Sequence, residues 1–331
     1  MNTIIENTIE LDPVSEYTTK TKGFTGLNDD LFSVLPGIEK AKEAPSIDVS
    51  DLNQQNFHND WVSNNKPCLI KGAIKHWPAT QKVKNEDYWL SVCDDFHIRV
   101  YPHMNYNMWD RQKVDSERIT FHNAIKRLHR NEDYILSIPS EKIAEGNRFS
   151  ELIKEMPGFS FLSNKIKPRM YDQRRFFMYR RAATSWHYHN VDETLMCQVS
   201  GAKKVALLPP DIPKAKQICD FLTNEKYLNE EKLDESLQLE SMVVTVEEGD
   251  ALYIPPYWHH AVVPVDGNIG FTLAYCWKSP WYKLGDLSNY FVRKLYKDGF
   301  WPLKLTSLIM PFIGVVSIGH HLINKLYKVF K

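Results

Sequence analysis

Histidines gather at two places in this sequence, both beside short apolar runs. The first is the segment 184–190, Thr-Ser-Trp-His-Tyr-His-Asn, which carries His187 and His189. Alternate side chains of a strand share one face, so these two imidazoles are expected to point the same way. The second is Trp-His-His at 258–260, which offers a third imidazole. Three neutral imidazoles suit a first-row metal ion, and their spacing alone does not choose between iron and zinc.

Short β-rich runs surround both histidine segments, with Gly, Pro and acidic turns between them. They cover 176–179, 195–199, 203–208, 242–246, 251–254 and 269–277. Many short strands with turn signals between them predict an all-β sandwich or barrel. In such a fold the two histidine segments, distant in sequence, can neighbour each other and share one ion. A charged, helix-prone insertion at 211–240 interrupts the strands, and residues 115–131 have helical spacing.

Several longer motifs lie between residues 65 and 260: NKPCLIKGAIKHWPA at 65–79, WHYH at 186–189, QVSGAKKV at 198–205, LPP at 208–210 and GDALYIPPYWHH at 249–260. These motifs resemble the cupin-like JmjC oxygenases, a family that includes the asparaginyl hydroxylase of hypoxia-inducible factor and the tRNA wybutosine hydroxylase. They occur in the order found in the family and together span roughly residues 50–280. The resemblance implies a mainly β fold, a double-stranded β-helix (jelly roll) with flanking α-helices.

The resemblance also implies a cofactor, a cosubstrate and the residues that hold them. Family members use Fe(II) with 2-oxoglutarate as cosubstrate. By position, His187 matches the first iron ligand and His260 the last. Lys203 matches the lysine that pairs with the distal carboxylate of 2-oxoglutarate, and Thr184 matches a hydroxyl that also touches the cosubstrate. Tyr134 matches a tyrosine donor on an early strand. The implied activity is hydroxylation of an unactivated C–H bond.

The sequence departs from the family at the second metal ligand. The family has a carboxylate in a His-x-Asp motif, and this chain has His189 there. Three readings stay open: His189 completes a three-histidine metal site, Asp192 or Glu193 supplies the carboxylate, or metal chemistry has been lost. Loss of one negative charge at the metal would raise its reduction potential. Thr194 stands where the family usually has an asparagine.

Two alternative functions follow from this departure. A three-histidine dioxygenase that does not use 2-oxoglutarate would make Lys203 incidental. A metal-bound cupin-like binding or scaffold protein would consume no oxygen. Arginine pairs at 174–175 and 180–181 bracket a strand before the histidines and could bind an anionic ligand, although solvated or ion-paired arginines are commoner. His259 should face away from His260 and be structural.

The rest of the sequence suggests three parts. Residues 1–45 read as an irregular leader, 46–285 as the cupin-like JmjC domain and 286–331 as a C-terminal helical segment. In that segment 305–318 is strongly apolar but interrupted by Pro311 and Gly314, and basic residues surround it. A homodimer through the C-terminal helices and a peripheral membrane contact of 300–331 both fit this pattern.

Composition limits the partners and the compartment. Lys plus Arg and Asp plus Glu balance at 41 each, so there is no strong nucleic-acid signal. Five cysteines without a CxxC pair, behind no secretory leader, favour reduced thiols and a cytoplasmic location. The substrate stays unidentified: a small molecule, a protein side chain and a modified nucleoside all remain open.

Overall fold

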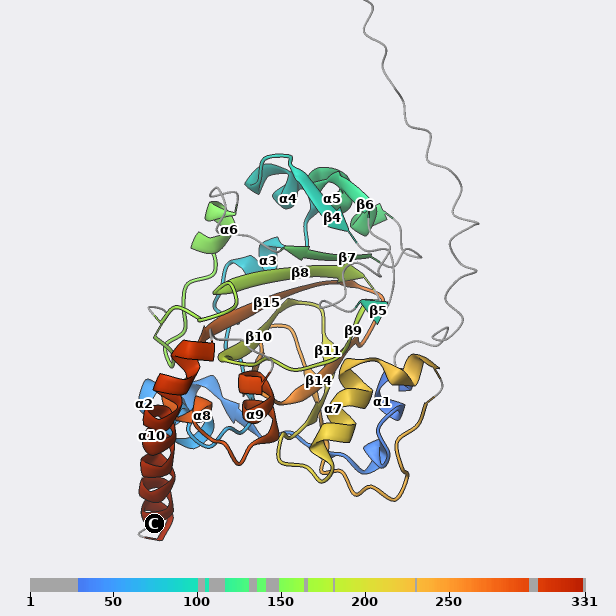
Figure 1. Ribbon diagram of the computed structural model, residues 1–331. Helices are drawn as coiled ribbons and strands as arrows, with labels where there is room; N and C mark the ends of the chain where they lie inside the picture. Colours follow the sequence, from blue (N-terminus) through green and yellow to red (C-terminus); the bar gives the residue numbers. More distant parts are fainter. Residues whose placement is uncertain are drawn as a thin grey trace, which may run out of the picture.

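Two large mixed β-sheets form the centre of the molecule (Figure 1). The computed structural model describes residues 29–100, 105–106, 117–130, 136–140, 149–163, 166–180, 182–229, 231–297 and 303–329. The six-stranded sheet has the order β1 (Lys42–Glu43), β12 (Met242–Val246), β11 (Lys203–Leu208), β14 (His259–Pro264), β9 (Ala183–His187), β5 (Asn105–Tyr106). The seven-stranded sheet has the order β2 (Ser46–Asp48), β3 (Cys68–Lys71), β13 (Ala251–Ile254), β10 (Asp192–Ser200), β15 (Ile269–Lys278), β8 (Arg174–Arg180), β7 (Leu136–Ser140).

The eight strands from β8 to β15 make the jelly roll. Antiparallel pairing gives β8-β15-β10-β13 in one sheet and β9-β14-β11-β12 in the other. The chain crosses between the sheets after β8, β9, β10, β12, β13 and β14. This arrangement confirms the predicted mainly β fold, a jelly roll with flanking helices. The six strand runs predicted from the sequence all lie in these strands.

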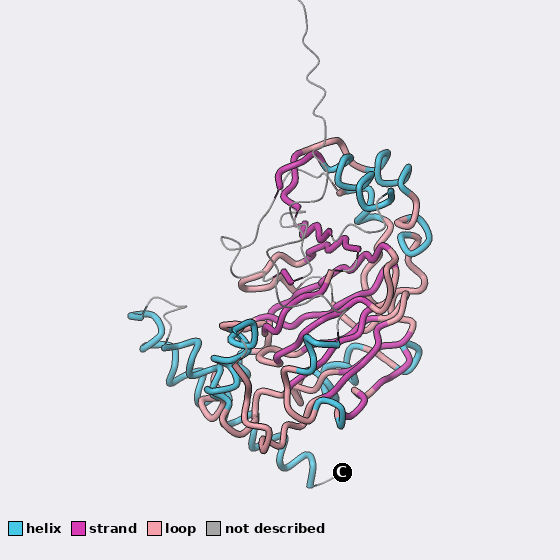
Figure 2. Tube along the Cα trace, turned by 90° about the vertical axis from the view of Figure 1, so that its right-hand side faces the viewer, coloured by secondary structure: helices cyan, strands magenta, loops and turns pink. Residues whose placement is uncertain are grey.

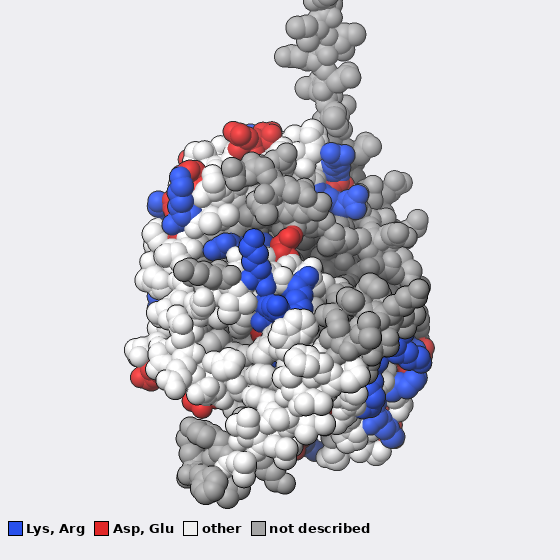
Figure 3. Space-filling model, turned by 60° about the vertical axis from the view of Figure 1, so that its left-hand side comes forward, with Lys and Arg blue, Asp and Glu red and all other residues white. Residues whose placement is uncertain are grey.

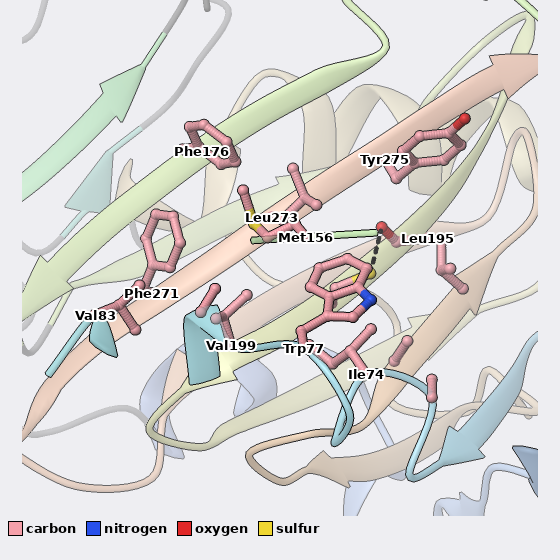
Figure 4. Close-up of a cluster of buried hydrophobic side chains, with 14 of the residues drawn as sticks. Ile74, Trp77, Val83, Met156, Phe176, Leu195, Val199, Phe271, Leu273 and Tyr275 are labelled. Carbon is pink, nitrogen blue, oxygen red and sulfur yellow. Dashed lines mark hydrogen bonds between the residues drawn. The ribbon is translucent and has the colours of Figure 1, made fainter. Parts of the chain in front are cut away.

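Three layers of apolar side chains hold the sheets in place. A cluster between the sheets takes side chains from both, including Met196, Val205 and Leu252. A larger cluster covers the outer face of the seven-stranded sheet, where Trp77 packs over strands β10 and β15 (Figure 4). A third lies on the outer face of the six-stranded sheet around Trp186. Because both faces of each sheet are covered, β10 is buried along its whole length.

Helices surround the sheets, and in the orthogonal view the strands fill the centre (Figure 2). The α-helices are α1 (Asp29–Ser33), α2 (Gln54–Asn56), α3 (Ala79–Lys82), α4 (Glu86–Val92), α5 (Phe121–Arg130), α6 (Ser150–Lys154), α7 (Ala215–Thr223), α8 (Trp281–Leu284), α9 (Tyr290–Lys297) and α10 (Leu303–Val329). Single turns of other helix types are η2 (Ile38–Lys40), η3 (Val49–Asp51), η4 (Phe57–Val62) and η5 (Lys226–Asn229). The predicted insertion at 211–240 contains α7 and η5.

One predicted helical boundary differs from the structure. The helix predicted over 115–131 begins at Phe121, because residues 117–120 form strand β6 (Glu117–Thr120) and pair with β4 (His97–Val100). In the C-terminal segment, α10 continues through Pro311 and Gly314. A proline inside a helix removes one backbone hydrogen bond without necessarily ending the helix. None of the described helices is long and apolar enough to cross a membrane.

The folded body includes the described part of the predicted leader. Leu31 and Phe32 are buried, and the Trp186 indole donates a hydrogen bond to the Leu31 carbonyl at 2.8 Å. Strand β1 adds to β12 in parallel, with Lys42 opposite Met242. The described residues 29–45 therefore pack against β9 and β12.

Candidate metal centre

Three histidines meet between strands β9 and β14. His187 is the last residue of β9 and lies directly opposite His260 of β14 in the sheet register. His189 follows two residues beyond β9. The ring centroids are 4.1 Å apart for His187 and His260, 4.9 Å for His189 and His260, and 5.4 Å for His187 and His189. One nitrogen from each ring lies within 4.8 Å of the other two, so a single ion could be reached by all three.

Hydrogen bonds fix which nitrogen of each ring faces the others. Nδ1 of His187 lies 2.8 Å from the Ser185 carbonyl, and Nδ1 of His260 lies 3.0 Å from the Trp258 carbonyl. A carbonyl oxygen only accepts, so both Nδ1 atoms must carry the proton. Nδ1 of His189 lies 2.8 Å from the Thr194 hydroxyl, which can accept in the same way. Each Nε2 is then left with a free lone pair, the form that binds a metal.

Burial keeps these imidazoles neutral. It lowers the pKa of His187 to about 4, and it lowers the pKa values of His189 and His260 well below their ordinary range. Mutual repulsion between the rings and the nearby positive charge of Arg175 act in the same direction. Near pH 7 the cluster therefore needs to lose no proton before it binds a cation.

The two carboxylates that follow His189 are occupied elsewhere. The Asp192 carboxylate accepts hydrogen bonds from the backbone N–H groups of residues 169, 170 and 171, at 2.7, 2.7 and 3.1 Å. Glu193 points to the other face of β10. There it is buried and accepts from the Tyr253 hydroxyl at 2.6 Å and from the Lys283 ammonium at 2.7 Å. Neither carboxylate joins the cluster, and His189 does.

Lys203 lies inside the jelly roll as an isolated cation. Its side chain is 5% exposed, and its ammonium lies 3.9 Å from the centroid of the Tyr179 ring. In the described part of the chain no carboxylate pairs with Lys203, and burial lowers its pKa to about 7. A bound carboxylate would supply the missing counter-charge.

The other predicted cosubstrate residues have different outcomes. Thr184 lies on β9, partly buried and opposite Val262 of β14. Tyr134 lies outside the described residues. Sequence reasoning missed Tyr179, whose hydroxyl accepts a 2.7 Å hydrogen bond from the Gln198 amide and whose ring faces Lys203. The period-2 pattern of β8 could have placed Tyr179 and Arg175 on one face.

His259 packs away from the cluster, as expected for a neighbour of His260 on one strand. Its ring lies 4.7 Å from that of Tyr188 and 5.1 Å from that of Phe291, between centroids. It is fully buried, and neither ring nitrogen has a hydrogen-bond partner. Burial lowers its pKa to about 3, so it packs as a neutral ring.

Comparison with known proteins agrees with this architecture. The model of the family described as "Cupin-like domain" matches residues 54–281, more than half of the chain. The chain belongs to the cupin-like domain family. Several of its curated relatives carry JmjC names, and the JmjC cupin-like family consists of iron- and 2-oxoglutarate-dependent oxygenases, among them demethylases and hydroxylases. The resemblance predicted from the sequence motifs is confirmed.

Three relatives show how far this cupin-like chain matches individual proteins. It is 26% identical to "Jumonji C domain-containing protein 5" of Drosophila melanogaster, over 66% of this chain and 56% of that protein. It is 26% identical to "Lysine-specific demethylase JMJ30" of Arabidopsis thaliana, over 64% of this chain and 50% of that protein. It is 23% identical to "Bifunctional peptidase and (3S)-lysyl hydroxylase JMJD7" of Homo sapiens, over 70% of this chain and 84% of that protein. The chain thus spans about half the length of the first two.

Proposed function

We propose that this cupin-like protein is an Fe(II)- and 2-oxoglutarate-dependent oxygenase that hydroxylates a C–H bond of a substrate still to be identified. One observation carries the proposal: three neutral imidazoles, those of the buried His189 and His260 and the half-buried His187, converge with their Nδ1 atoms already bonded and their Nε2 atoms free. Three nitrogen ligands on one side of an ion leave its other positions open for small ligands. Membership of the JmjC family favours iron as that ion.

His187, His189 and His260 would hold the iron. When bound, iron and 2-oxoglutarate supply the oxidising chemistry, in which one atom of O2 converts the cosubstrate to succinate and CO2 and the other enters the substrate as hydroxyl. The carbonyls of Ser185 and Trp258 and the Thr194 hydroxyl orient the three rings. Ligands orientated in this way need no rearrangement when the ion arrives.

Lys203 supports a dicarboxylate as cosubstrate. Its ammonium is buried, has no carboxylate partner among the described residues and rests against the Tyr179 ring. An unpaired buried cation is costly unless a ligand neutralises it, and 2-oxoglutarate carries a distal carboxylate that can do so. The same residue argues against a three-histidine dioxygenase without a dicarboxylate cosubstrate, since such an enzyme has no use for Lys203.

The test is an anaerobic Fe(II) titration of the purified protein with and without 2-oxoglutarate. A chelate between ferrous iron and 2-oxoglutarate gives a weak visible charge-transfer band. We expect a band that needs both components, and at least a tenfold weaker affinity for 2-oxoglutarate in Lys203→Met. Iron binding without a band would favour the dioxygenase that does not use 2-oxoglutarate. Absence of iron binding would favour the binding or scaffold protein.

A further inference from the structure

The inside of strand β8 presents a second cation to the metal centre. Phe176 and Met178 point outward into the large apolar cluster, so Arg175, Phe177 and Tyr179 share the opposite face. On that face the Nη2 atom of Arg175 lies 3.7 Å from Cys276 Sγ. The same sulfur lies 3.6 Å from the Thr194 hydroxyl, which holds His189.

Aromatic rings hold the Arg175 guanidinium beside His189. Its Cζ atom lies 4.6 Å from the centroid of Tyr171 and 5.9 Å from that of Phe177. The Tyr171 ring in turn lies 5.4 Å from the His189 ring, between centroids. The positive charge is close enough to lower the pKa values of all three cluster histidines. Two independent chains of contact, through Cys276 and through Tyr171, therefore connect Arg175 to the metal centre.

Within the described residues Arg175 has no carboxylate partner. Its Nε atom is buried and makes no hydrogen bond. The nearby Asp192 carboxylate is already engaged by three backbone N–H groups. Buried polar groups without a partner are rare in folded proteins and call for an explanation. A guanidinium is a planar fork that matches the two oxygens of a carboxylate or phosphate.

The cosubstrate does not account for Arg175. Lys203 contacts Tyr179, which lies four residues further along β8 than Arg175, or about 13 Å at ~3.3 Å per residue. The contacts of strand β10 show the same separation between Lys203 and Arg175. Gln198 contacts Tyr179 at the Lys203 end, whereas Thr194 contacts His189 at the Arg175 end. A dicarboxylate anchored on Lys203 would place one carboxylate at the Tyr179 end of β8 and would leave Arg175 without a counter-charge. The two cations therefore serve two different ligands.

We propose that Arg175 binds an oxyanion of the substrate, a carboxylate or a phosphate, and so places the substrate beside the three histidines. This inference rests on the proposed function and names its substrate class as acidic. Lys and Arg side chains gather near the middle of the face in Figure 3. Two further cations share one aromatic ring: the Arg169 Cζ and the Lys278 Nζ lie 4.5 and 4.9 Å from the Trp281 ring centroid.

The test measures binding of inorganic phosphate and of acetate, separately, by calorimetry on anaerobic full-length protein saturated with Fe(II) and 2-oxoglutarate. We expect Arg175→Met to weaken one of the two anions at least tenfold while 2-oxoglutarate affinity changes less than twofold. Arg174→Met is the matched control, because Arg174 neighbours it on the same strand but lies over the Tyr275 ring on the other face. That variant should bind like the wild type. The preferred anion distinguishes a phosphate from a carboxylate substrate.

Three results would overturn the proposal: equal anion binding in both variants, no anion binding by the wild type, or loss of 2-oxoglutarate binding in Arg175→Met. The last would make Arg175 a cosubstrate residue. The titration is repeated on Lys203→Met protein without 2-oxoglutarate. A difference between Arg175→Met and Arg174→Met in that background supports the anion site even where the cosubstrate proposal fails.

Discussion

At position 189 the resemblance to the family implies a carboxylate, this chain has an imidazole, and the surroundings of the side chain suit an imidazole. A ligand carboxylate needs hydrogen-bond donors, whereas the Nδ1–H of His189 needs an acceptor. Thr194, where the family usually has an asparagine, offers a hydroxyl at 2.8 Å that can accept. His189 and Thr194, the two residues that depart from the family pattern, therefore contact each other. Sequence reasoning found each departure separately, but it could not pair them, because the contact depends on how residues 188–193 turn.

We expect the metal content to separate the three cluster histidines from His259. Either His187→Ala or His260→Ala removes one of three ligands and should reduce bound iron at least tenfold. His259→Phe should bind iron like the wild type, because its ring packs away from the cluster. This variant also removes two buried, unpartnered nitrogens, so its stability should be unchanged or higher by about 1 kcal/mol. Metal analysis and urea unfolding check both; equal iron loss in all three variants would contradict the ligand assignment.

Restoring the carboxylate at 189 should return one negative charge to the metal. We expect His189→Asp to bind Fe(II) at least as tightly as the wild type and to lower its reduction potential. Spectroelectrochemistry on the iron-loaded variant measures the potential. His189→Asn is the neutral control of the same shape and should not lower it. An iron-free but folded His189→Asp protein would indicate that the second ligand lies elsewhere.

The affinity for 2-oxoglutarate should depend on pH through Lys203. Burial lowers the pKa of the Lys203 ammonium to about 7, and a bound carboxylate raises it again. The complex then binds a proton more tightly than the free protein, so affinity falls as pH rises above 7, by at most tenfold per pH unit. Titrations at pH 6, 7, 8 and 9 measure the slope. Lys203→Met should give weak, pH-independent binding; a profile shared with the wild type would rule Lys203 out as the cause.

Among the elements, β15 positions Lys203 by making room for Tyr179. Gly270 lies directly opposite Tyr179 on the paired strands, and a Cβ atom at 270 would overlap the Tyr179 ring. The Lys203 ammonium lies against that ring, and the Tyr179 hydroxyl accepts a hydrogen bond from the Gln198 amide. Only glycine fits this close approach of a strand to an aromatic ring.

Gly270→Ala should displace Tyr179, cost about 1–3 kcal/mol of stability and weaken 2-oxoglutarate binding. Gly314→Ala in α10 is the matched control, because a Cβ atom there meets no atom within 4 Å. It should stabilise the protein by about 0.5–1 kcal/mol, since alanine is the better residue inside a helix. Urea unfolding and cosubstrate titration check both variants. A Gly270→Ala protein as stable as the wild type would show that the ring can move freely.

The sequence predicts those strands whose own run of apolar and β-branched residues marks them as strands. The runs 203–208, 242–246 and 251–254 match β11, β12 and β13 residue for residue. Residues 117–120 are different, because they form a strand only through pairing with β4, a distant segment. The same limit applies at the site. The histidines could be found from their spacing, but the face of Arg175 and its contacts with Tyr171 and Cys276 depend on sheet register.

For the molecule as a whole, the C-terminal helix leaves an apolar face open. Seven large apolar side chains of α10 are 36% to 71% exposed: Phe312, Val315, Val316, Ile318, Leu322, Ile323 and Leu326. Residues 312, 316, 319, 323 and 326 follow the alternating 4-3 spacing at which two helices pack side by side. In Figure 1 this helix extends beyond the rest of the body. We propose that a second copy of the chain covers this face, with both copies contributing the same helix.

The full-length protein should therefore have about twice the 38.7 kDa mass of one chain by light scattering. Ile323→Glu should return it to the single mass, because a charge in a packed helix seam is costly. His321→Glu, exposed but outside the 4-3 series, should leave the mass unchanged. Sedimentation with phosphatidylserine vesicles tests the membrane contact. A single mass in the wild type, with or without vesicle binding, would contradict pairing of the chains.

Strand β10 connects this C-terminal region with the histidines. Glu193 on one face is bound to Lys283 of α8, and Tyr282 of α8 stacks on His320 of α10 with ring centroids 3.5 Å apart. The next residue, Thr194, holds His189 on the other face. Coupling free energy between two sites acts equally in both directions. If association of two chains through α10 tightened iron binding, iron would tighten that association by the same factor. The iron supply would then also set the fraction of chains that are dimeric.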